Sequence, residues 1–192
     1  MRWWMIVLLV LIVLVVIVWI ASANTTVLQC ALIRLICSGN AGVKPNDYDA
    51  VLSSIDTLAE DISYNSVFDN GVLDIYAAKG NSPKPLIVYA HGGYYVGDDK
   101  RDFAYYCQTL ASRGYVVANM NYQLAPEGRY PTQMLQVNEA IDFLLSHAEE
   151  YRIDTQKIFI GGDSAGAHLS SQMGLYYTNP AIQERIGGEP AI

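Results

Sequence analysis

A short apolar run that leads into a glycine-flanked serine constrains this chain more than any other feature. Residues 158–160 (Ile-Phe-Ile) indicate a strand buried on both faces, and the sequence Gly-Asp-Ser-Ala-Gly follows over residues 162–166. A serine on a tight turn from strand to helix takes strained backbone angles, and glycines two positions to either side remove side-chain clashes there. This spacing predicts a nucleophile elbow that presents the Ser164 hydroxyl at the N-terminal end of the next helix.

The charged residues are unevenly distributed along the 192 residues. The first forty contain no Asp or Glu, whereas the sequence from Ala41 onward carries 10 Lys and Arg against 19 Asp and Glu. Such an acidic surface repels phosphate backbones, so nucleic acid is not expected as a partner. The length suits one domain with a real core behind an apolar N-terminal segment.

Residues 3–20 form an uncharged apolar run. As a helix it would span roughly 27 Å, close to the hydrocarbon thickness of a bilayer, with tryptophans at both ends for the headgroup interface. We therefore predict that residues 1–23 form a single-pass membrane anchor, with the larger C-terminal part outside the cytoplasm. The alternative is a signal peptide cleaved near Ala23, because residues 21–23 read Ala-Ser-Ala; the length of the run favours the anchor.

Residues 24–45 are predicted to be a membrane-proximal segment and a linker. The apolar stretch 27–37 is too short to span a bilayer, which favours an interfacial helix or the return leg of a hairpin. Cys30 and Cys37 would lie about 10 Å apart on a helix, too far for a disulfide. Together with Cys107 they are interpreted as small buried apolar residues.

Residues 46–192 alternate between helical and strand-like patterns, which predicts a mostly parallel sheet with helices on both faces. Apolar spacing and turn residues predict helices over residues 47–62, 103–113 and 131–148, strands over residues 72–76, 86–90 and 115–120, and a two-residue hairpin turn at Asn70 and Gly71.

A second motif follows the strand that ends at Ala90: residues 91–95 read His-Gly-Gly-Tyr-Tyr. Acyl transfer passes through a tetrahedral oxyanion, and each backbone N–H group aimed at it contributes about 3–4 kcal/mol. Glycines beside a strand end let such amides turn inward. This pattern indicates an oxyanion-binding loop.

Together with Asn-Tyr-Gln-Leu-Ala-Pro-Glu over residues 121–127, these motifs resemble the α/β-hydrolase superfamily. They are similar to those of hormone-sensitive-lipase-like, feruloyl-esterase-like and kynurenine-formamidase-like esterases, and they occur in the family's order over residues 72–173. The resemblance implies an α/β-hydrolase fold and a serine hydrolase that cleaves a small-molecule carboxylic ester.

The resemblance also implies roles for single residues. Ser164 would be the nucleophile, and the N–H groups of Gly93, Tyr94 and Ala165 would form the oxyanion hole. His91 would order the loop and not act as the base. The residues themselves show no metal cluster, phosphate-cradling loop or dinucleotide fingerprint, so no cofactor or metal is expected. The tyrosines at positions 94, 95 and 122 either line an aromatic pocket or pack in the core.

Such esterases supply an acid and then a histidine after the serine. Only 28 residues follow Ser164, and His168 is their single histidine, beside Glu184 and Glu189. On the same helix as the serine, His168 is interpreted as an ordinary helix residue. We therefore expect these 192 residues to be the front part of a longer protein. We expect them to be inactive alone, and the sheet to be open at its C-terminal side. Two alternatives remain: a non-catalytic hydrolase-fold membrane protein that acts as a binding module, and a truncated product without stable fold.

Overall fold

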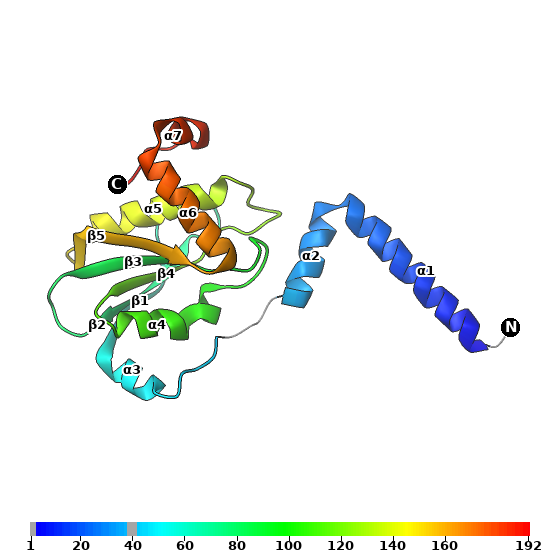
Figure 1. Ribbon diagram of the computed structural model, residues 1–192, viewed down its shortest axis with the longest axis horizontal. Helices are drawn as coiled ribbons and strands as arrows, with labels where there is room; N and C mark the ends of the chain where they lie inside the picture. The colour runs from blue at the N-terminus through cyan, green and yellow to red at the C-terminus, as the bar shows by residue number, and fades with distance from the viewer. Residues whose placement is uncertain (1–2, 38–41) are drawn as a thin grey trace.

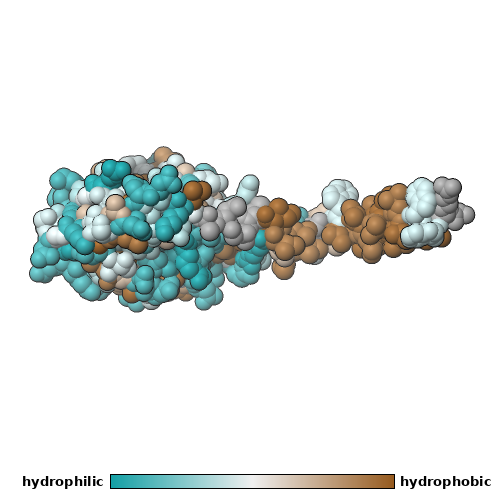
Figure 2. Space-filling view, turned by 90° about the horizontal axis from the view of Figure 1, so that it is seen from below, coloured by the Kyte–Doolittle hydropathy of each residue, from teal (hydrophilic) through white to brown (hydrophobic). Residues whose placement is uncertain are grey.

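The computed structural model describes residues 3–37 and 42–192; the predicted linker therefore lies partly outside the described residues. Two helices, α1 (Trp3–Asn24) and α2 (Thr26–Cys37), form an arm that precedes an α/β domain (Figure 1). The apolar character is concentrated in this arm, whereas the visible face of the domain is largely hydrophilic (Figure 2). Within α1, residues Trp3–Ala21 are long and apolar enough to cross a membrane, so this helix is either a signal sequence or an anchor.

The domain is built on five strands in the spatial order β1-β2-β4-β3-β5. They are β1 (Ile55–Ser63), β2 (Val72–Ala78), β3 (Lys84–Ala90), β4 (Val116–Met120) and β5 (Ile153–Gly162). β3 runs parallel to β4 and β5, but β2 is antiparallel to both β1 and β4. The sheet is therefore mixed: β3, β4 and β5 are parallel as predicted, whereas the two antiparallel pairings of β2 correct the prediction of a mostly parallel sheet. Helical crossovers keep β3, β4 and β5 parallel, whereas the short connections on either side of β2 reverse the chain.

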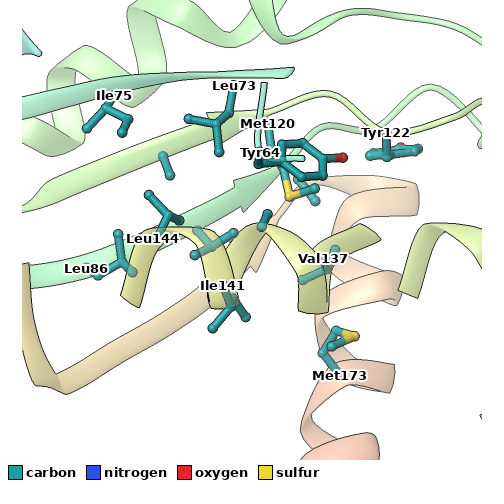
Figure 3. Packing of buried hydrophobic residues seen from close by; sticks show 14 of the residues in the cluster. Tyr64, Leu73, Ile75, Leu86, Met120, Tyr122, Val137, Ile141, Leu144 and Met173 are labelled. Carbon is teal, nitrogen blue, oxygen red and sulfur yellow. The ribbon is translucent and has the colours of Figure 1, made fainter. Parts of the chain in front are cut away.

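Helices cover both faces of the sheet, as the strand–helix alternation predicted (Figure 1). They are α3 (Tyr48–Ser54), the 3-10 turn η1 (Lys100–Phe103), α4 (Ala104–Ala111), α5 (Thr132–Ser146), α6 (Ser164–Thr178) and α7 (Pro180–Ile186). On one face, Val137, Ile141 and Leu144 of α5 pack toward Leu73 and Leu86 of the sheet (Figure 3). A smaller cluster on the other face includes Cys107, which is fully buried as expected.

The predicted helix over residues 47–62 was wrong in its second half. α3 ends at Ser54, and Ile55–Ser63 is β1, the edge strand paired with β2. The register of this pair shifts twice, between Thr57 and Ala59 and between Ala59 and Ile62. Each irregularity inserts residues that break the alternation of sides, so apolar residues recur three or four positions apart, as they would in a helix.

The predicted two-residue turn at Asn70 and Gly71 was also wrong. Pairing of β1 with β2 ends at Ser63 and Val72, so residues 64–71 form the connection. Tyr64 turns into the core, and its hydroxyl donates to the carbonyl of Asn121 at 2.9 Å. Anchoring this side chain requires the longer loop.

Candidate active site

The bend between β5 and α6 brings the serine to the end of the sheet. Gly162, the last residue of β5, pairs with Ala90 of β3, and α6 begins at Ser164 with φ 46°. This left-handed angle is strained for a serine and typical of functional turns. A Cβ on Gly162 would lie 2.2 Å from the Ala90 carbonyl oxygen, and one on Gly166 only 1.9 Å from it. The two glycines thus let β5 and α6 approach β3.

The loop after β3 lies directly beside this bend. It is tightly wound, with φ 95° at Gly93, 59° at Tyr94 and 62° at Tyr95, and the Gly93 carbonyl accepts the N–H groups of residues 96 and 97. Within the described residues, the N–H groups of Gly93, Tyr94 and Ala165 have no hydrogen-bond acceptor. Both segments therefore offer unpaired amide donors near the start of α6.

Asp163 connects the two segments. Its Oδ1 accepts the Gly92 N–H at 2.9 Å and the Tyr89 hydroxyl at 3.2 Å. The carboxylate makes no capping bond to α6 and binds the loop after β3 instead. The contact depends on β3 and β5 being neighbours, so only the resemblance of the motifs could have pointed to it.

His91 supports the loop from beneath. Its ring is fully buried and stacks on Tyr122 with 4.5 Å between centroids, while the Tyr122 hydroxyl donates to the His91 carbonyl at 2.7 Å. Burial lowers the pKa of this imidazole, which favours the neutral form. These contacts suit a structural role.

Neither of the other two histidines reaches the serine. His168 lies one turn along α6, with its Nδ1 2.9 Å from the Tyr95 hydroxyl, and His147 stacks on Phe143 at the end of α5. Within the described residues, no side chain hydrogen-bonds the Ser164 hydroxyl, and no group of three or more His, Cys, Asp or Glu could hold a metal ion.

A cavity of about 570 Å³ begins beside His168. It is lined by Thr26, Tyr95, Ala125, Gly128, Arg129, Tyr130, Gln133, His168 and Gln172. Of the three tyrosines left open by the sequence, Tyr95 lines this cavity, Tyr122 is buried beneath the loop and Tyr94 is exposed.

Comparison with known proteins supports the interpretation of this geometry. The sequence pattern of the family described as BD-FAE matches residues 73–189, which include both loops and the whole of α6. The chain belongs to this family of α/β-hydrolase esterases. It is 34% identical over 110 residues to an esterase of Gibberella moniliformis, covering 55% of this chain and 35% of that protein. It is 30% identical over 118 residues to kynurenine formamidase of Danio rerio, covering 60% and 39%.

Solved structures show the same fold. Esterase B of Lactobacillus rhamnosis superposes with a TM-score of 0.67 at 23% identity, over 92% of this chain and 53% of that one. A bacterial heroin esterase gives a TM-score of 0.59 at 23% identity, over 80% and 53%. The chain spans only about a third of the length of the curated relatives and half that of these structures.

Replacing Asp163 tests the connection between the two segments. Asp163→Ala leaves the Gly92 N–H without its acceptor, and we predict that kcat of the native protein for a soluble ester such as p-nitrophenyl butyrate falls by roughly 10-fold to 100-fold. Asp163→Asn keeps an acceptor oxygen, so its kcat should fall less than that of Asp163→Ala. Asp142→Ala, an exposed carboxylate on α5, is the matched control. Unchanged kcat in Asp163→Ala would show that this contact does not position the loop.

Proposed function

We propose that the protein is a membrane-anchored serine esterase in which Ser164 forms the acyl-enzyme. One observation carries the proposal: the strained bend at Ser164 lies beside a loop whose Gly93 and Tyr94 amides are unpaired, as is the amide of Ala165. Curated relatives named as esterases support an ester substrate.

The reaction follows from these groups. The Ser164 oxygen attacks the ester carbonyl carbon, and the charge that develops on the carbonyl oxygen is stabilised by the three N–H donors and the N-terminus of α6. Collapse of the tetrahedral intermediate expels the alcohol and leaves an acyl-serine. Water then attacks the acyl group, and the serine is regenerated.

A general base must accept the proton of Ser164. His91, His147 and His168 all have other contacts, so we propose that residues 1–192 alone do not turn over ester. The base and its acidic partner would come from elsewhere in the protein, in line with the greater length of the relatives.

We further propose that α1 is retained as the anchor, with the domain outside the cytoplasm. Its 19-residue apolar span is longer than a usual signal core of about 7–15 residues. The proposed division is residues 1–23 for the anchor, 24–45 for the membrane-proximal segment and 46–192 for the hydrolase domain. Cleavage near Ala23, giving a secreted form, remains the alternative.

A fluorophosphonate probe tests the esterase proposal, because it reacts with serines made nucleophilic by their site. Native protein isolated from its own membranes should be labelled, and mass spectrometry should place the label on Ser164. Heat-denatured protein is the control and should stay unlabelled. A folded native protein without label at this serine would contradict the proposal and favour the binding module.

A further inference from the structure

One side of α2 is fixed to the catalytic domain. The Arg34 side chain donates to the carbonyls of Val96 and Ala125, both at 2.7 Å, and to the carboxylate of Glu127 at 2.8 Å. Cys30, one turn earlier, is only 5% exposed. Because Val96 belongs to the loop that carries the unpaired amides, the position of α2 is tied to the site.

Several apolar residues of α2 are uncovered. Val27, Ala31 and Leu35 follow one another at four-residue spacing, and Ile36 is exposed on another part of the helix surface. Val27 is 67% exposed, Leu35 82% and Ile36 79%. Arg34 is the single charged residue of α2, and its guanidinium is paired with Glu127, so the exposed residues Val27, Gln29, Ala31, Leu35 and Ile36 carry no charge.

The position of these exposed residues next to α1 indicates what they contact. α1 ends at Asn24 and α2 begins at Thr26, so Val27 lies only six residues after the apolar span, which ends at Ala21. The two helices present apolar residues along the arm (Figure 2). If α1 crosses a bilayer, α2 must lie at its surface, where apolar helix faces insert among the acyl chains.

The cavity adjoins the same end of α2. Thr26, the first residue of the helix, contributes to the lining together with Tyr130 and His168, and the surface of the cavity is mostly apolar. His168 is four residues from Ser164, about 6 Å along the axis of α6. Ser164 does not itself line the cavity, so a molecule entering beside Thr26 would reach the serine by extending past His168.

We propose that α2 is an interfacial helix that holds this cavity at the bilayer surface, so that the enzyme takes long-chain esters directly from the lipid leaflet. This inference rests on the proposed esterase function and the retained anchor. The substrates would be esters whose acyl or alkyl chain resides in the membrane.

Photo-crosslinking tests the inference without requiring turnover. The native protein is reconstituted in phosphatidylcholine vesicles that contain a long-chain ester with a diazirine in its acyl chain. After irradiation, mass spectrometry should find crosslinks in residues 125–130 and 168–172. The double variant Leu35→Asp/Ile36→Asp should reduce these crosslinks at least about tenfold, because it removes two apolar side chains from the bilayer contact.

Val67→Asp is the matched control, since Val67 is also 82% exposed but lies in the loop between β1 and β2. It should crosslink like the unmodified protein. A water-soluble short-chain diazirine ester should label the cavity equally in all three proteins, which verifies that the cavity is intact. Unchanged vesicle crosslinking in the double variant, or crosslinks only outside the cavity, would overturn the inference. Fluorophosphonate labelling of Ser164 reports separately on the esterase function.

Discussion

Replacing Ser164 by alanine in the native protein should lower ester hydrolysis by on the order of 10⁵-fold, measured as kcat on p-nitrophenyl butyrate. The substitution removes the oxygen that would form the acyl-enzyme, while the oxyanion donors and the cavity remain. It should be structurally mild, because no hydrogen bond of the Ser164 side chain is found within the described residues. Unaltered circular dichroism and thermal unfolding would attribute the loss to chemistry.

Ser171→Ala provides the control on the same helix. Ser171 is exposed, and its hydroxyl bonds the Ala167 carbonyl at 3.0 Å, a contact of little consequence for the site. Its kcat should stay within about twofold of the unmodified protein. If Ser164→Ala kept a tenth of the activity, a different nucleophile would be responsible.

Lys100→Met should destabilise the domain by about 3–5 kcal/mol, the largest stability effect that we expect. The Lys100 side chain is 2% exposed, and its ammonium group pairs with the carboxylates of Asp74 and Asp61. Asp74 is itself buried on β2. Without the lysine, that carboxylate is left in the interior with no cation. Urea unfolding followed by circular dichroism measures the loss.

Two further variants separate charge from packing. Lys79→Met, at an exposed position just after β2, should leave the free energy of unfolding unchanged. Lys100→Met/Asp74→Asn should recover at least half of the loss, because a neutral amide can still accept the Asp61 N–H and needs no cation. Equal stability of Lys100→Met and the unmodified protein would rule out a structural role for this pair.

The backbone of Lys100 also makes hydrogen bonds close to the candidate active site. The Lys100 N–H donates to the Asn121 side chain at 2.7 Å, and the Asn119 side chain donates to the Lys100 carbonyl at 2.7 Å. These bonds fix the segment after the Gly93 loop against the end of β4. Gly97 in that segment lies so close that a Cβ on Gly93 would come within 2.2 Å of its carbonyl oxygen. Because these bonds use backbone atoms of Lys100, Lys100→Met should keep them and leave the amide donors in place.

The parts of the fold that could be predicted are those with local causes. The strands ending at Gly162 and Ala90 were recognisable because each is an uninterrupted apolar run followed by glycines. The prediction that residues 158–160 are buried on both faces was wrong, however: Phe159 is 53% exposed, because β5 is the last strand of the sheet. β1 could not be recognised as a strand, because its two register irregularities reproduce a helical spacing of apolar residues. The connection over residues 64–71 depends on Tyr64 reaching Asn121, which no local pattern encodes.

The candidate site also has parts that the local sequence predicts and parts that it does not. The bend at Ser164 follows from its own glycines, whereas the contact of Asp163 with Gly92 joins residues 71 positions apart. The burial of Lys100 and of its partner Asp74 runs against the usual exposure of charged side chains. A helix over residues 27–37 could be predicted, but not its attachment through Arg34, whose only signal was one charge in an apolar stretch.

Because the junction between α1 and α2 is short, proteolytic cleavage there would change the charge next to the cavity. A cut after Ala23 would create a new α-amino group two residues before Thr26, which lines the cavity. Such a group has a pKa of about 7.7–8.0 and is mostly positive at neutral pH. The trimmed protein would then present a cation at the rim where the uncut protein continues into an apolar helix, and carboxylate-bearing ligands would be favoured there.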